Sequence, residues 1–89
     1  MRFIWDEINR QKNLQKHGLD FADVEVVFDQ PLVLFEDTLI NYGEQRMVAI
    51  GLLQILVVVI VHIEDDNTIR IISMRKATHN ETDIYYQNI

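Results

Sequence analysis

The sequence predicts an α+β fold: a sheet of four or five mainly antiparallel strands, with two N-terminal helices and one C-terminal helix. Three observations lead to this prediction. The 89 residues are enough for a single domain with one hydrophobic core. The longest apolar run, at residues 52–63, is rich in β-branched side chains and too short for a membrane-spanning helix, so it is typical of a buried strand. Helix-start signals precede and follow a series of strand-like segments, as they do in α+β proteins.

The first predicted elements are a short strand at residues 1–5 and a helix that follows it. Asp6 is a suitable N-cap for this helix, and Glu7 in its first turn matches the helix dipole. We expect the helix to run to about His17, because Gly18 is suited to the position just after a helix.

A second helix is predicted to begin at Asp20 and to pack on the core. Its apolar side chains recur at helical spacing, at Phe21, Val24, Val27 and Phe28. Pro31 follows shortly afterwards and ends the helix.

Four strands are predicted next, at residues 32–35, 45–53 and 54–64 and in a segment that begins at Thr68. The strand at residues 54–64 is apolar on both of its alternating faces, which places it in the centre of the sheet. Gly51 is expected to mark a bulge or a bend.

The segment of residues 68–81 changes from a strand to the start of a helix. Its first half is rich in isoleucine, which favours a strand. At its end, Thr78 and Glu81 form a T-x-x-E capping box, in which each side chain accepts a hydrogen bond from the other residue's backbone amide. The capping box predicts a final helix over residues 79–88.

Two cations, Arg75 and Lys76, lie between the strand half and the helix half of the segment of residues 68–81. A strand that carries cations to a helix N-terminus is suited to phosphate, because positive charge and fixed hydrogen-bond donors converge there. The alternative is that Arg75 and Lys76 are solvated charges at a strand end. Regular alternation along the strand places Arg70 and Lys76 on one face of the sheet, and Ser73 and Arg75 on the other.

The distribution of charge restricts the partners that the chain can bind. Its net charge is −6. Residues 1–17 carry four cations and two carboxylates, a net charge of +2, whereas the remainder carries four cations and twelve carboxylates, a net charge of −8. Phosphate affinity comes largely from Lys and Arg, so an acidic chain contacts nucleic acid only through a local cluster. An acidic surface is equally suited to a basic partner.

No metal or cofactor site is predicted. The chain has no cysteine, its three glycines are far apart, and its three histidines lack the spacing of metal ligands. Arg2, Asp6 and Glu7 occupy the region where a secretory signal has its apolar segment, so we expect a cytoplasmic protein without a membrane partner.

Two clusters of side chains are suited to RNA cleavage. Metal-independent cleavage needs a base for the 2′-hydroxyl proton, an acid for the leaving oxygen and cations for the charge on phosphorus. One cluster lies at the end of the first helix and contains Lys12, Lys16 and His17. The other lies on the last two strands and the final helix and contains His62, Arg70, Arg75, Lys76 and Tyr85.

Motifs in both halves of the chain extend this reasoning. The first half contains Trp5-Asp6, Asn13, Lys16-His17-Gly18, Phe21, Phe28 and Pro31. The second half contains Gly43-Glu44, Arg46, Ala49-Ile50-Gly51, His62, Glu64 and the run from Arg70 to Thr78. In register over nearly the whole chain, these residues resemble the BrnT toxin family.

The resemblance implies a RelE-like endoribonuclease toxin of a bacterial type II toxin–antitoxin pair, which cleaves mRNA and is neutralised by a BrnA-type antitoxin. It also implies that operator DNA is contacted only through the antitoxin. In this enzyme interpretation, Arg70 and Arg75 stabilise charge on the phosphate, and His62 or Tyr85 transfers the proton. The expected RNA-binding residues are Lys16, His17, Arg46 and Lys76. We expect the antitoxin to place carboxylates against Lys16, Arg70 and Arg75.

A second interpretation is a binding module with weak or no catalytic activity, which engages an antitoxin and takes part in regulating its operon. After Thr78 the family is usually rich in Lys and Arg. This chain instead has His79, Asn80, Thr82 and Asp83, and near His62 it has Ile63 and Asp65 where the family often has Thr and Arg. The missing cations favour the binding module, whereas the retained Arg70, Arg75, Lys76 and Tyr85 favour the enzyme.

Overall fold

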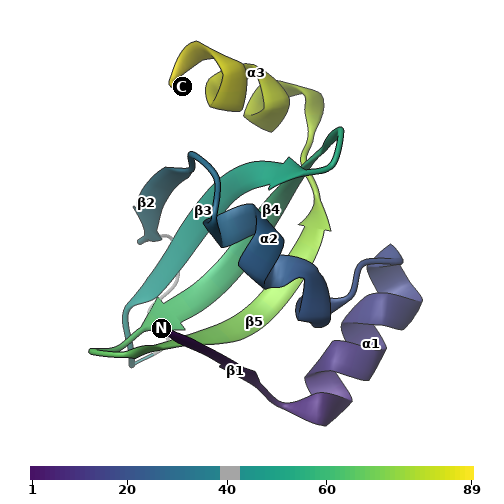
Figure 1. Cartoon of the computed structure of the whole chain (residues 1–89), viewed down its shortest axis with the longest axis vertical. Coiled ribbons are helices and arrows are strands. Elements are labelled where there is room, and N and C mark those ends of the chain that lie inside the picture. Colours follow the sequence, from purple (N-terminus) through teal and green to yellow (C-terminus); the bar gives the residue numbers. More distant parts are fainter. Residues whose placement is uncertain (39–42) are drawn as a thin grey trace.

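The computed structural model describes residues 1–38 and 43–89, which form one five-stranded sheet with helices before and after its main strands (Figure 1). In chain order the elements are β1 (Arg2–Trp5), α1 (Glu7–His17), the 3-10 helix η1 (Phe21–Asp23), α2 (Val24–Phe28), β2 (Val33–Asp37), β3 (Arg46–Leu53), β4 (Leu56–Glu64), β5 (Thr68–Lys76) and α3 (His79–Gln87). None of the helices in this part of the chain has the length and apolar character needed to cross a membrane.

The α+β class is confirmed, but the sheet is mixed rather than mainly antiparallel. The strand order is β1-β5-β4-β3-β2. The consecutive strands β2 to β5 pair antiparallel, whereas β1 pairs parallel with β5. The antiparallel part follows from short connections between neighbouring strands. The position of β1 depends instead on its pairing with residues 68–71 of β5, which are far away along the chain, and no local pattern determines this contact.

The ends of the helices depend on the predicted capping residues. The Asp6 carboxylate accepts a hydrogen bond from the backbone amide of Asn9, and Gly18 takes the left-handed conformation just after α1. At the start of α3, both hydrogen bonds of the capping box are present. The second helix differs from the prediction, because it opens as η1 before α2 begins.

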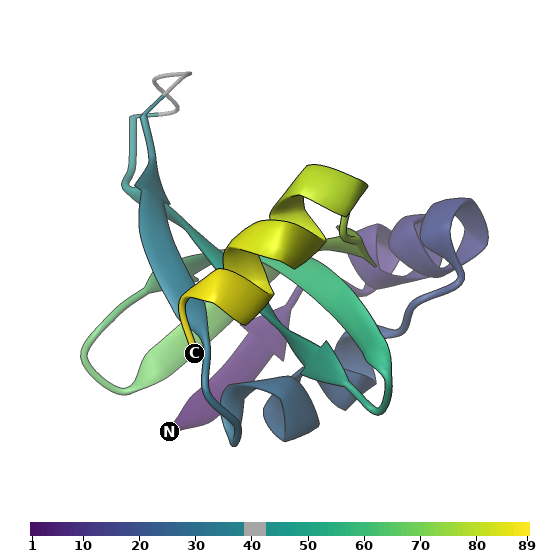
Figure 2. The same ribbon diagram turned by 90° about the horizontal axis from the view of Figure 1, so that it is seen from above.

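The two faces of the sheet are covered unequally. We call the face that carries Val58 and Ile60 the first face; it packs against η1 and α2 in the larger of two apolar clusters. The opposite, second face carries Val57 and Val59 and packs against Tyr85 of α3. Helices α2 and α3 therefore lie on opposite sides of the sheet (Figure 2), and α1 lies beside the edge formed by β5 (Figure 1).

A β-bulge in β5 changes which side chains share a face. Ser73 pairs with Val61, but the next pair along the ladder is Ile71 with His62, so the intervening residue of β5 has no partner. This extra residue is Ile72, and it reverses the alternation. Arg70, Ser73 and Arg75 consequently lie on the second face, and Lys76, which pairs with Val58, lies on the first. The regular alternation expected from the sequence was therefore wrong.

Gly51 does not mark a bulge, because it pairs in register with Val58. Its role is to allow α2 and the following segment to approach β3. A Cβ atom at this position would lie 2.6 Å from Cγ1 of Val27 and 2.7 Å from Cδ2 of Leu32. Only glycine leaves room for these contacts.

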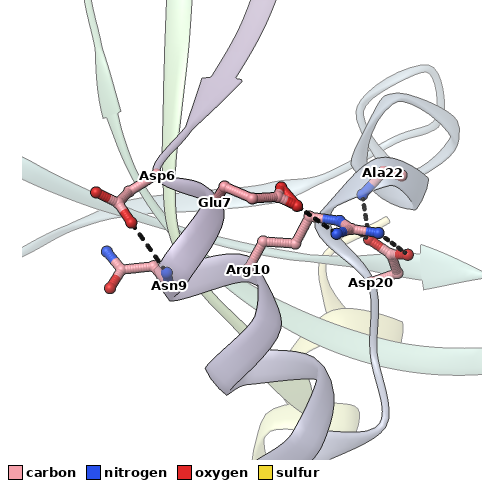
Figure 3. Close-up of polar contacts among 6 residues, drawn as sticks. All are labelled: Asp6, Glu7, Asn9, Arg10, Asp20 and Ala22. Atoms are coloured by element: carbon pink, nitrogen blue, oxygen red, sulfur yellow. Dashed lines mark hydrogen bonds and ion pairs between the residues drawn. The ribbon is translucent and has the colours of Figure 1, made fainter.

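Arg10 fixes the connection between α1 and η1. Its guanidinium donates hydrogen bonds to Glu7 on the same helix and to both carboxylate oxygens of Asp20, at 2.8 and 3.1 Å (Figure 3). Asp20 also accepts a hydrogen bond from the amide of Ala22. The hydrogen bonds from Arg10 are the main reason why the pKa of Asp20 is below its ordinary value. This cation of α1 therefore has a structural role.

Asn13 attaches α1 to the sheet by imitating a neighbouring strand. Its side-chain amide donates a hydrogen bond to the carbonyl oxygen of Met74 at 2.8 Å and accepts one from the Met74 amide at 3.1 Å. It also donates to the carbonyl of Leu19 at 3.1 Å. Because β1 pairs with β5 only as far as Ile71, no strand in residues 1–38 or 43–89 pairs with the backbone of Met74 on this side. Asn13 supplies the missing donor and acceptor.

We expect Asn13→Ala to lower the free energy of unfolding by about 2–4 kcal/mol, because it leaves a buried amide and a buried carbonyl of Met74 without partners. Asn9→Ala is the matched control on the same helix. The Asn9 side chain is exposed, so its removal should change stability by less than about 0.5 kcal/mol. Urea denaturation monitored by circular dichroism measures both values, and equal losses would contradict the role of Asn13.

Candidate functional site

The second face of the sheet has an open part beside α3. The helix packs over Val48, Ile50, Val57 and Val59, which are buried. Farther from it, five residues of β4 and β5 are half-buried or exposed: Val61, Ile63, Arg70, Ser73 and Arg75. We call these five residues the open part of the second face. It combines two arginines and a hydroxyl with an apolar floor, so it can accept an anionic ligand.

Arg46 lies on the same face, as the alternation with Val48 on β3 shows. It is half-buried, pairs across the sheet with Asp37, and interacts with neighbouring groups. The structure thus places this expected RNA-binding residue near the open part of the second face.

Arg75 is held by a carboxylate. Its two terminal nitrogens donate parallel hydrogen bonds to the two oxygens of Glu81, at 2.7 and 2.9 Å. The same carboxylate accepts a hydrogen bond from the amide of Thr78 in the capping box. These contacts, led by the hydrogen bond from Arg75, lower the pKa of Glu81 to about 2. The ion pair therefore fixes Arg75 of β5 to the first turn of α3.

Arg70 is also paired, but at the surface. One terminal nitrogen donates to both oxygens of Glu44, at 3.1 and 3.0 Å. The two side chains are 47% and 43% exposed, compared with 38% and 20% for Arg75 and Glu81. Solvent competes for exposed ion pairs, so Arg70 is the more readily available of the two arginines.

A cationic hollow of about 300 Å³ lies between α1 and the outer edge of β5. It is lined by Asn9, Lys12, Asn13, Lys16, His17, Ile72 and Ser73. Over residues 1–38 and 43–89, neither Lys12 nor Lys16 has a carboxylate partner, in contrast to Arg10 on the same helix. Ser73 belongs both to the hollow and to the open part of the second face. The two surfaces are therefore adjacent.

Lys12 belongs to the cluster that the sequence indicated at the end of the first helix, although it was not among the expected RNA-binding residues. It also lines the hollow. It lies four residues before Lys16, so both side chains project from the same side of α1. This spacing was visible in the sequence. The sequence did not show where β5 lies. Its position beside α1 makes that side of the helix one wall of a hollow.

His62 lies away from these cations. The residue is fully buried on the first face, where its ring packs edge-on against Phe28 with the centroids 5.1 Å apart. One ring nitrogen, Nε2, lies 2.8 Å from a carboxylate oxygen of Glu64, and the other lies 3.3 Å from the carbonyl oxygen of Ile60. The sheet separates His62 from Arg70 and Arg75.

Tyr85 is buried on the second face and Lys76 lies on the first, so neither belongs to the open part of the second face. Tyr85 is only 2% exposed, and its hydroxyl donates to the carbonyl oxygen of Pro31 at 3.3 Å. Lys76 is exposed on the first face. Of the four predicted catalytic residues, the structure places Arg70 and Arg75 on the same face of the sheet and leaves His62 and Tyr85 in the core. Lys16 and His17 line the neighbouring hollow.

Within the part of the chain that the structure describes, no three His, Asp or Glu side chains are grouped so that they could hold a metal ion.

We expect the Glu81–Arg75 pair to make stability depend on pH in the acid range. The folded-state pKa of Glu81 is about 2, below its ordinary value of 4.5. Its contribution is therefore complete above pH 4.5 and is lost as the pH falls from 4.5 to 2. Glu81→Gln should lower the free energy of unfolding at pH 7 by about 1–2 kcal/mol, less than the full pKa shift implies because the pair is partly exposed.

Denaturant unfolding between pH 2 and pH 7 tests this expectation. The difference between the wild-type chain and Glu81→Gln should shrink as the pH approaches 2. Asp83→Asn is the matched control, since it removes an equal charge from an exposed position on α3. A difference that stays constant with pH would show that packing rather than charge is lost.

Comparison with known proteins identifies the family of the chain. A family model described as the ribonuclease toxin BrnT of type II toxin–antitoxin systems matches residues 5–81, which include both α1 and the whole of β5. No curated protein sequence matches the chain. The match covers most of the 89 residues, so the chain belongs to the BrnT family of ribonuclease toxins of type II toxin–antitoxin systems.

Proposed function

We propose that this chain is a cytoplasmic, RelE-like endoribonuclease that cleaves mRNA by metal-independent acid–base chemistry and is neutralised by a BrnA-type antitoxin. The observation that carries the proposal is the bulge at Ile72. It places Arg70 and Arg75 on one face of an acidic protein, next to the hollow lined by Lys12 and Lys16 of α1. Such a local group of cations is what an acidic chain needs to contact RNA.

The arginines are suited to the charge that develops during cleavage. Attack of a 2′-hydroxyl oxygen on phosphorus forms a phosphorane with added negative charge, and the 5′-oxygen then leaves. A guanidinium can donate two hydrogen bonds to the phosphorane oxygens and remains charged throughout. Arg70 is proposed for this role, because both terminal nitrogens of Arg75, the other expected arginine, are bound by Glu81. Lys16 is proposed for binding the adjacent backbone phosphate.

The geometry gives little support to His62 and Tyr85 as the residues that transfer the proton. His62 and Tyr85 are buried, so either must become exposed to reach RNA. His17 is exposed and lines the hollow beside Ser73. An imidazole can accept a proton from one oxygen and give one to another. We therefore add His17 to the candidates for the acid–base group.

A second candidate function is a binding module that engages the antitoxin without cleaving RNA. The specific observation in its favour is that both arginines of the second face already have carboxylate partners, Glu44 and Glu81. An antitoxin would then use the same cationic surface. The family to which the chain belongs implies a protein antitoxin in either case.

Induced expression in a bacterium discriminates between the two functions. If the chain is an endoribonuclease, the wild type should arrest growth and cleave cellular mRNA. The Lys12→Ala, Lys16→Ala double variant should reduce cleavage by about tenfold or more, because each phosphate contact contributes to affinity at physiological salt. Lys76→Ala removes a cation from the first face and is the control. Soluble, folded wild-type chain without cleavage would support the binding module.

The antitoxin should share this surface, so charge reversal at Lys16 should weaken the complex. We expect Lys16→Glu to raise the Kd for the co-encoded partner at least tenfold, which corresponds to about 1.4 kcal/mol, because like charges then face each other. Lys76→Glu makes the same change in charge on the opposite face and should change the Kd by less than about threefold. Calorimetry at one fixed salt concentration measures both. Equal effects would place the antitoxin elsewhere.

A further inference from the structure

The two arginines of the second face are bound by internal carboxylates, and the two ion pairs differ in how easily they can open. A carboxylate and a phosphate present a similar pair of oxygens to a guanidinium. A phosphodiester can therefore bind either arginine only in place of the carboxylate already there. The arginine whose partner is easier to displace becomes the phosphate site.

Glu81 is difficult to displace from Arg75. It lies in the first turn of α3, it makes two parallel hydrogen bonds to the guanidinium, and one of its oxygens also accepts from the amide of Thr78. In return the Thr78 hydroxyl accepts from the Glu81 amide. Moving this carboxylate would break the capping box together with the ion pair. Arg75 is thus held as part of the fold.

Glu44 is easier to displace from Arg70. It lies two residues before β3, outside any helix or strand, and both members of the pair are more than 40% exposed. Over residues 1–38 and 43–89, Arg70 is the hydrogen-bond partner of the Glu44 carboxylate. Exposed ion pairs of this kind contribute little to stability, so an incoming anion meets little resistance.

The surroundings of Arg70 suit a nucleotide rather than a free anion. Its cross-strand neighbours are Ile4 on β1 and Ile63 on β4, both half-buried on the same face. Strand β4 lies between β5 and β3, so Glu44 reaches across β4 to meet Arg70. Displacing Glu44 would free the guanidinium and uncover apolar surface beside it, on which a ribose or a base can pack.

We propose that Arg70 is the exchangeable phosphate-binding arginine of this surface and that Glu44 occupies it until a phosphodiester of single-stranded RNA takes its place. Arg75 stays bound to Glu81 and positions the start of α3. Glu44 is in this sense an internal competitor of the substrate. The assignment rests on the proposed contact with RNA, and it also predicts how the protein binds simple anions.

Binding measurements on folded variants test the assignment. The probes are a short single-stranded RNA with 2′-O-methyl groups, which cannot be cleaved through its 2′-oxygens, and inorganic pyrophosphate. Glu44→Gln should bind both more tightly than the wild type, by about two- to fivefold at fixed salt, since an exposed ion pair no longer competes. Glu36→Gln is the matched control. It removes the same charge from an exposed residue of β2 that pairs with Met47 on the first face.

Two further variants locate the effect. Glu44→Gln combined with Arg70→Ala should lose the gain for both probes, because the freed guanidinium is gone. Glu81→Gln should give no gain beyond that of Glu36→Gln. Equal affinities for Glu44→Gln and Glu36→Gln, or a gain that survives the loss of Arg70, would overturn the assignment.

The two probes separate this inference from the proposed function. A gain for pyrophosphate that depends on Arg70, in a chain that does not cleave mRNA, would support the phosphate site and count against the endoribonuclease. The opposite result is that the chain cleaves mRNA while Glu44→Gln changes the affinity for neither RNA nor pyrophosphate. It would support the endoribonuclease and count against the phosphate site.

Discussion

The proposed site depends on one extra residue in a strand. If Ile72 were paired within a regular ladder, Arg70 and Arg75 would lie on opposite faces of the sheet. A bulge costs some ladder hydrogen bonding and twists the strand, and such features often aim a side chain. Here it groups two cations and a hydroxyl on one open surface. The same residue, displaced from the ladder, lines the hollow beside α1.

The sequence predicted the elements of this fold more completely than their arrangement. Caps such as Asp6 and Thr78 act over three or four residues, so local pattern identified them, and the apolar run of β4 indicated its central position. The parallel pairing of β1 and the bulge in β5 depend on contacts between distant segments. Gly51 shows the same limit: a glycine in a strand suggested a bulge, but the approach of Val27 explains it.

For the candidate site, too, the sequence indicated the types of residue but not their arrangement. Residue types suggested cations and proton-transfer groups, and the structure groups the cations Arg70 and Arg75, with Lys16 nearby. It places His62 and Tyr85 in the core because the alternation and the helix packing that bury them involve residues far along the chain. The sequence also did not show which charged residues pair with each other, since Glu44 and Arg70 are 26 residues apart. A count of cations could not show which of them already have partners.

The side chain of Asn13 has a consequence for the behaviour of the protein in concentrated solution. Among the residues that the structure describes, no strand pairs with the outer side of β5 beyond Ile71, and a bare strand edge is a template for pairing with another molecule. Asn13 and the helix that carries it block that edge, using hydrogen bonds in place of a strand. Resistance to edge-to-edge aggregation in this region therefore depends on a single amide. Any partner or condition that detaches α1 would open a route to self-association.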